Sequence, residues 1–124
     1  MTIHFDAPSL KSTDLEESEL RPPTAQSLSG PILTRSKIVH SDPDRGITAG
    51  VWESEPGTSR WEFRDRGEFI HVVAGRMTVT QDGGDAVEIS AGQTALFRIG
   101  WCGTWTVHER LRKTFLVLSE ASGE

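Results

Sequence analysis

The sequence lacks the features that would tie the chain to a membrane or to an oxidising compartment. It has a single cysteine, Cys102, so no disulfide can form within the chain. No apolar run comes near the roughly 20 residues that a membrane-spanning helix needs. No segment has the charged start, apolar middle and small-residue cleavage site of a secretory signal. We therefore expect no membrane partner and a cytoplasmic location.

The chain also lacks an excess of positive charge. Its 13 lysine and arginine residues are outnumbered by 18 aspartate and glutamate residues, which gives a formal net charge of −5. Binding to a phosphate backbone needs clustered basic side chains, and here the basic residues are interleaved with acids. We expect no nucleic-acid partner.

Residues 1–31 show no sustained hydrophobic periodicity, and we expect them to form an irregular N-terminal arm. They contain scattered acids together with Pro22 and Pro23. Two interpretations stay open, a disordered tail or an arm that packs across a partner subunit. A short helical turn over residues 12–20 is also compatible with the sequence, because Ser12 or Thr13 can cap it.

Residues 32–124 have the composition of a folded unit, and the whole chain has the length of one domain. Short segments rich in β-branched and aromatic residues alternate with clusters of Gly, Pro and Asp, which predicts nine strands. They cover residues 32–40, 46–53, 60–64, 68–74, 76–81, 86–90, 94–98, 103–108 and 112–118. No interval of helical period is long enough for the crossovers of a parallel sheet. We predict an all-β, antiparallel barrel or sandwich.

The clearest local element is a hairpin over residues 77–89. Its turn contains Gly83 and Gly84, which adopt turn conformations that other residues reach with difficulty. Apolar residues alternate with polar ones at positions 77, 79, 87 and 89. This alternation predicts one buried and one solvent-facing side.

Two segments resemble the sequence motifs of the cupin superfamily. In the first, Glu68 is followed after six residues by Gly75 and then by a strand, as in the second half of the first cupin motif. In the second, Gly92 opens a strand that leads to a turn ending in Gly100, with Arg98 where the superfamily usually has proline. The resemblance implies an RmlC-like jelly roll, which is an antiparallel double-stranded β-helix.

Further segments resemble the ureidoglycine aminohydrolase-type subfamily of cupins, which includes proteins similar to the ethanolamine-utilisation cupin. They are residues 50–53, 60–63, 101–107 and 112–115, and the whole resemblance covers residues 32–118. It implies a homodimer, and the unpaired strand edges of an open jelly roll also favour a partner. We expect the outer face with Phe69, His71 and Val73 to form the interface.

The histidines that bind metal in cupins are absent from the matching positions. Metal-binding members carry a His-x-His step before the glutamate and a third histidine after the second-motif turn. The matching positions are Trp61 and Phe63, or residues 62 and 64 in the alternative register, and then Gly103. Only Glu68 of the four ligands is present, so we expect neither a metal nor another cofactor.

Three other potential ligands, His71, Cys102 and His108, have the wrong strand parity for the barrel interior. A metal site built from them would need a β-bulge that rotates one of them inward. We expect the two histidines on the outer face or at an interface, and Cys102 as a small buried hydrophobe.

Strand alternation predicts an aromatic-lined pocket inside the barrel. If Glu68 points inward, Gly103 shares a face with two tryptophans and leaves extra space where a ligating side chain usually projects. The predicted ligand-binding residues are Trp61, Phe63, Glu68, Arg98, Trp101, Trp105 and Lys113. The tryptophans are also compatible with an ordinary core, since each buries about 150–250 Å² of surface. We expect Trp52 to have that role alone.

Lys113 is the basic residue that strand parity directs into the barrel, and it matches a lysine that the subfamily usually carries. Facing Glu68, it forms either a buried ion pair or ligand clamp, or a catalytic pair with shifted pKa values. We favour the first, because such pairs shift pKa values without doing chemistry. Arg98 is either a contact for an anionic or ureido-like ligand or a solvated turn charge.

Three functions follow from these residues. The first is binding of a small metabolite in the barrel without the usual cupin metal. The second is an enzyme of ureidoglycine-type chemistry, with Glu68 as general acid or base and Lys113 as its electrostatic partner. The third is an accessory subunit whose barrel is filled by side chains. The resemblance implies a manganese ion for the enzyme, and the loss of the histidines argues against that activity, so we favour binding.

Overall fold

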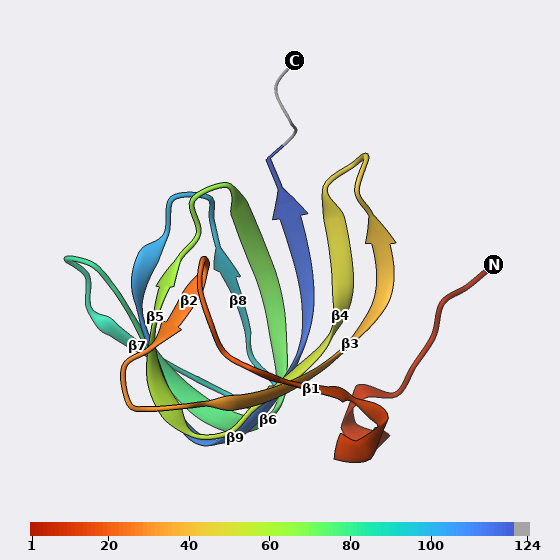
Figure 1. Cartoon of the computed structure of the whole chain (residues 1–124), viewed down its shortest axis with the longest axis horizontal. Coiled ribbons are helices and arrows are strands. Elements are labelled where there is room, and N and C mark those ends of the chain that lie inside the picture. The colour runs from red at the N-terminus through yellow and green to blue at the C-terminus, as the bar shows by residue number, and fades with distance from the viewer. Residues whose placement is uncertain (121–124) are drawn as a thin grey trace.

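The computed structural model describes residues 1–120, which form mainly antiparallel β-strands (Figure 1). Two short 3₁₀ turns, η1 (Ala7–Ser9) and η2 (Ser12–Asp14), precede the strands. The strands are β1 (Glu16–Glu19), β2 (Ala25–Ser27), β3 (Leu33–Asp42), β4 (Ile47–Ser54), β5 (Gly57–Glu62), β6 (Arg66–Gln81), β7 (Ala86–Ser90), β8 (Thr94–Phe97) and β9 (Cys102–Ser119). The predicted all-β, antiparallel fold is confirmed.

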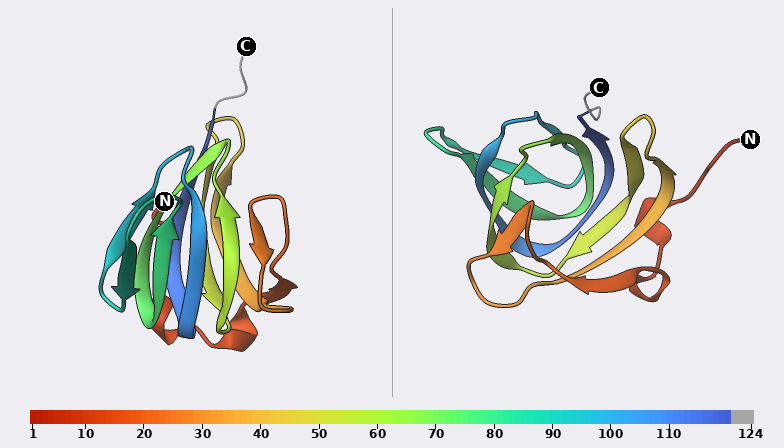
Figure 2. Two further views of the ribbon diagram at one scale, coloured as in Figure 1. Left: turned by 90° about the vertical axis from the view of Figure 1, so that its left-hand side faces the viewer. Right: turned by 45° about the horizontal axis from the view of Figure 1, so that its top comes forward.

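Two long strands, β6 and β9, run through both halves of the barrel. They pair with each other from Arg66 opposite Ser119 to Gln81 opposite Gly103. In one half they continue into β8 on one side and into β4, β3 and β1 on the other. In the other half they continue into β7 on one side and into β5 and β2 on the other. The resulting sheet curls around a central core (Figure 2).

The bend in these two strands corrects the strand boundaries expected from the sequence. The pattern predicts separate strands at 68–74 and 76–81 and at 103–108 and 112–118, whereas each pair is one continuous strand. Register shifts between Val72 and Met77 bend β6 against β9. Gly75 lies there with a φ of 87°, and a Cβ at this position would collide with the carbonyl oxygen of Arg110. A glycine that resembles a strand break is therefore a bend within a strand.

The N-terminal arm pairs with its own chain. β1 pairs antiparallel with β3, and β2 pairs with β5, so the arm adds edge strands to the barrel and is not an unstructured tail. The helical turn expected over residues 12–20 is limited to η2, because Glu16–Glu19 is extended and pairs with β3. Packing of the arm across a partner subunit stays a prediction.

Charged side chains hold the start of the arm against the outer face of β4 and β9. The Arg112 guanidinium donates hydrogen bonds to Glu53 at 2.7 and 3.1 Å, to the Ala7 carbonyl at 3.0 Å and to the Leu10 carbonyl. The Ser12 hydroxyl also donates to Glu53, at 2.9 Å. Burial raises the pKa of the Glu53 carboxyl, but these hydrogen bonds outweigh that effect and the pKa is lowered. Glu53 therefore stays ionised where it meets the arm.

The core lies inside the curled sheet, and strand alternation assigns its members correctly. Ile70 and Val72 are fully buried and Glu68 is nearly so, whereas Phe69 is 48% exposed on the outer face. The predicted inward direction of Glu68 and its neighbours is confirmed. No helix in residues 1–120 is long and apolar enough to cross a membrane.

Candidate functional site

A buried ion pair lies at the centre of the barrel. The Lys113 Nζ is 2.7 Å from the Glu68 Oε2, and the two residues are 1% and 5% exposed. Both occupy inward positions on neighbouring strands, with Val72 of β6 opposite Lys113 and Val117 of β9 opposite Glu68. The prediction that strand parity brings these two side chains together is confirmed.

Three tryptophan rings surround the Lys113 ammonium. Its Nζ lies 4.4 Å from the ring centre of Trp52, 4.5 Å from that of Trp105 and 5.6 Å from that of Trp61. An ammonium within about 6 Å of an aromatic face is attracted to it, most strongly when water is excluded. The rings and the Glu68 carboxylate together replace the hydration shell of the charge.

Trp52 is the member of this site that the sequence does not reveal. We expected it to be core alone, yet it lies directly opposite Lys113 in the pairing of β4 with β9 and shares its face. That pairing joins residues 61 positions apart in the sequence, so no local pattern indicates it.

Burial lowers the pKa of the Lys113 ammonium, and the charge and hydrogen bond of Glu68 oppose that effect without cancelling it. An ammonium has three N–H donors. Among the residues that the structure describes, Lys113 donates one side-chain hydrogen bond, to Glu68. The ammonium therefore retains donors that could bind a further acceptor.

The Trp105 indole supplies another donor without an acceptor. Trp105 is fully buried, and within residues 1–120 its Nε1 has no hydrogen-bond partner. The neighbouring Trp61 differs, because its Nε1 donates to the Ser59 hydroxyl at 2.8 Å. A buried N–H without an acceptor costs about 1–3 kcal/mol, so such groups usually meet a water or a ligand.

Aromatic rings close the barrel above the ion pair, and this corrects the expected open pocket. Trp61 and Trp105 stack with ring centres 3.8 Å apart, and Phe63 stacks on Phe97 at 5.6 Å. Trp101 packs edge-on against Phe97 at 5.0 Å. Phe63 and Phe97 are only 1% and 2% exposed. The predicted rings are thus brought together, but as a packed stack and not as the walls of an open mouth.

Gly103 does not provide the extra space expected from its missing side chain. A Cβ there would collide with the carbonyl oxygen of Thr80 and would lie 2.7 Å from the Cη2 of Trp101. The sequence indicates the missing side chain, but it does not indicate that β6 and an indole occupy the place. This expectation was wrong, because close packing removes the space.

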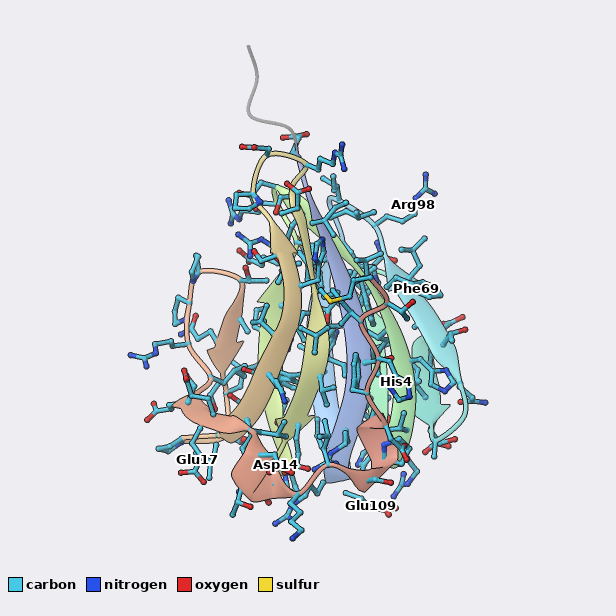
Figure 3. The ribbon with its side chains drawn as sticks, turned by 90° about the vertical axis from the view of Figure 1, so that its right-hand side faces the viewer. His4, Asp14, Glu17, Phe69, Arg98 and Glu109 are labelled. Carbon is cyan, nitrogen blue, oxygen red and sulfur yellow. The ribbon has the colours of Figure 1, made fainter. Side chains whose placement is uncertain are left out.

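Arg98, the remaining predicted site residue, does not approach the ion pair. It lies in the turn between β8 and β9 and points away from the barrel (Figure 3). With Leu96, Ile99 and Trp101 it borders a surface hollow of about 440 Å³. The solvated turn charge is therefore the better description of Arg98.

The side chains present do not fit the metal centre of metal-binding cupins. The positions that match the three histidines hold Trp61, Phe63 and Gly103, and Glu68 is engaged by Lys113. In the described part of the chain, no three His, Cys, Asp or Glu side chains gather closely enough to hold a metal ion. His108 is exposed on the outer face and hydrogen-bonds the Thr78 hydroxyl at 2.7 Å.

The EutQ-like cupin domain family matches residues 41–115, more than half of the chain. The chain is a EutQ-like cupin. None of the curated proteins matches it. The match shows the cupin fold that the sequence motifs imply, whereas the ureidoglycine aminohydrolase-type subfamily is not confirmed.

Solved structures share this EutQ-like cupin fold. The EutQ protein of Clostridium difficile superposes with a TM-score of 0.61 at 18% identity, over 72% of this chain and 64% of that one. A DUF861-family protein of unknown function from Pseudomonas syringae gives 0.73 at 23% identity, over 90% of this chain and 46% of that one. A DUF861-family protein from Thermotoga maritima gives 0.50 at 29% identity, over 52% and 73%. The chain thus spans less than two thirds of the first two proteins.

Proposed function

We propose that this EutQ-like cupin binds a small polar molecule through an acceptor oxygen, such as that of a carboxylate or an amide. The observation that supports this is the surplus of donors at the centre of the barrel. Lys113 donates to Glu68 and has further N–H groups, and the Trp105 Nε1 has no acceptor among the described residues. An oxygen bound there would accept hydrogen bonds that no other group in residues 1–120 accepts.

The ion pair is better explained by binding than by stability. Desolvating two charges costs several kcal/mol, and replacing a buried pair with apolar residues of similar volume is often neutral or stabilising. A core that only had to fill this barrel would need neither Lys113 nor Glu68. The pair instead offers a ligand a positive donor and a negative acceptor, held 2.7 Å apart and shielded from water.

The residues suggest how such a ligand would be held. Its acceptor oxygen would approach the Lys113 ammonium, and an adjacent N–H or O–H group would donate to Glu68. The faces of Trp52 and Trp105, which already flank Nζ, would contact its apolar part. Urea-like and amide-like molecules carry both groups, and carboxylates carry the first.

Thermal unfolding in the presence of small probes tests this proposal. We expect formate, acetate, acetamide or urea at millimolar concentration to stabilise the wild-type protein relative to Lys113→Met, because only a folded site with the ammonium binds the oxygen. Arg98→Met is the matched control, since it removes a positive charge outside the barrel. If no probe distinguishes wild type from Lys113→Met, the barrel is a filled core and the binding role is wrong.

Enzymatic use of the pair, with Glu68 as general acid or base, and the cytoplasmic location stay predictions of the sequence. Proton transfer requires Glu68 to exchange its partner Lys113 for a substrate group. Turnover that is unaffected by Glu68→Gln or by Lys113→Met would exclude these two residues from catalysis.

We also propose that the protein forms a homodimer through the outer face of the sheet. Phe69 lies opposite Leu96 on β8 and Leu116 on β9, and Leu116 lies opposite Ala49 on β4, so one apolar row crosses four strands. Phe69 and Leu96 are 48% and 58% exposed. Light scattering should give a dimer for wild type and a monomer for Phe69→Glu, and a wild-type monomer at micromolar concentration would contradict the proposal.

A further inference from the structure

We propose that the indole of Trp101 is a gate that controls access to the Lys113–Glu68 pair. The inference rests on the proposed binding function, because the pair is buried and a ligand needs a path to it. Trp101 is the outermost ring of that stack and is partly exposed, whereas Phe63, Phe97 and Trp105 behind it are buried. It is the ring whose movement would open the barrel with the least disturbance of the core.

The backbone at Trp101 is fixed, so the gate must move by side-chain rotation. The Phe63 N–H donates to the Trp101 carbonyl at 2.9 Å, and the Gly100 N–H donates to the Phe63 carbonyl at 2.6 Å. The Trp101 N–H closes the turn by donating to the Arg98 carbonyl at 2.9 Å. These hydrogen bonds hold the backbone on both sides of the turn. The indole of Trp101 therefore moves by rotation about its two side-chain dihedrals, χ1 and χ2.

Space for the rotated ring lies on the outer side of Trp101. The hollow of about 440 Å³ that it borders is lined by Leu96, Ile99 and Arg98 and is open to solvent. Leu96 and Ile99 are 58% and 48% exposed, so an indole turned outward would cover apolar surface there. In the closed position the ring lies against Phe97 and over Gly103. Both positions bury apolar surface, which is what a two-position gate needs.

The inner side of the gate leads to the ion pair. Trp101 contacts Phe97 with ring centres 5.0 Å apart, and Phe97 lies directly opposite Glu68 in the pairing of β8 with β6. Glu68 in turn contacts Lys113. Rotation of Trp101 removes the ring that packs edge-on against Phe97 and Phe63 on this side of the pair.

The chain contains an internal reporter for this gate. Its three lysines are Lys11, Lys37 and Lys113. The first two are exposed and the third is 1% exposed. Reductive methylation with formaldehyde and a borane reductant modifies lysine amines that the small reagents can reach. Peptide mass spectrometry then gives the rate at Lys113 relative to Lys37 in the same sample, which cancels differences in reagent concentration.

We expect Trp101→Ala to raise the relative methylation rate of Lys113 by about tenfold or more, because the protection of a buried group reflects the cost of opening. Trp101→Phe, with a shorter ring, should give a smaller increase. Val87→Ala is the matched control, since it shortens an exposed apolar side chain on β7 that does not line this hollow, and should leave the rate unchanged. An unchanged rate in both Trp101 variants would overturn the proposal.

Global unfolding is the alternative route to Lys113, and denaturant separates it from gating. Opening of the gate exposes little surface, so the methylation rate of Lys113 should vary weakly with urea concentration below the unfolding transition. If Lys113 reacted only in the unfolded chain, its rate would rise with urea as steeply as the m-value of unfolding requires. A full dependence in wild type would overturn the gate. The result is independent of ligand binding, so failure of the small-molecule probes with a Trp101-sensitive Lys113 would reject the binding role alone.

Discussion

Removing one partner of the Lys113–Glu68 pair should destabilise the protein strongly, whereas removing both should not. Lys113→Met and Glu68→Leu each leave a group that is at least 95% buried without its counter-charge. Breaking a buried pair in this way costs about 3–5 kcal/mol. The double variant Lys113→Met, Glu68→Leu fills the same volume with apolar atoms, and we expect its free energy of unfolding to return to within about 1 kcal/mol of wild type.

Urea denaturation followed by tryptophan fluorescence measures these changes. Wild type, the two single variants and the double variant give a coupling energy that belongs to the pair, provided that the m-value stays constant. Asp82→Asn is the matched control, because Asp82 forms a two-pronged pair with Arg60 at 2.5 and 2.7 Å on the surface. We expect only a small effect there, since solvent screens exposed pairs.

Two results would refute this reasoning. If each single variant costs less than about 1 kcal/mol, the pair behaves as an exposed one and water reaches the barrel centre. If the double variant loses the sum of both single effects, Lys113 and Glu68 are not coupled and do not form a site together.

Two further predictions concern pH and the N-terminal arm. Burial lowers the pKa of Lys113 in the folded state. At pH values between the pKa of the folded state and that of the unfolded state, the unfolded chain binds more protons, so the free energy of unfolding rises with pH. Glu68→Gln removes the group that raises this pKa, so urea denaturation of that variant should show the rise starting at a lower pH than in wild type. Arg112→Met removes the hydrogen bonds to the Ala7 and Leu10 carbonyls, and hydrogen exchange should increase at the amides of residues 5–12 but not in β6. Unchanged exchange in the arm would mean that its strand pairing alone holds it.

Strand alternation made the interior of the barrel predictable from the sequence. Because side chains on a strand alternate between two faces, placing Glu68 inside also placed Ile70 and Val72 there, and the same rule on β9 directed Lys113 inward. The inward direction of these side chains needs only local geometry. The spacing from Glu68 to Gly75 indicated the cupin fold through its resemblance to the superfamily motif.

Contacts between distant strands were not predictable in this way. Trp52 contacts Lys113 because β4 pairs with the end of β9. The space beside Gly103 is occupied because the backbone of β6 and the Trp101 indole lie against it. Both contacts depend on which strands are neighbours in the sheet. No local pattern in a single sequence indicates that order. The buried contacts of Arg112 with the arm have the same origin. Strand parity therefore paired Glu68 with Lys113 correctly, but it left out Trp52, wrongly included Arg98 and did not indicate the close packing of the rings.

The indole N–H resonances of ¹⁵N-tryptophan-labelled protein test the proposed binding of an acceptor oxygen most directly. The four tryptophans give four signals, and Trp105→Phe identifies the one whose Nε1 has no acceptor within residues 1–120. During titration with acetate or acetamide, we predict a saturable shift of the Trp105 signal that Lys113→Met abolishes, while the signal of Trp61, bonded to Ser59, moves less. A Trp105 signal that stays fixed up to the highest probe concentration would contradict the account.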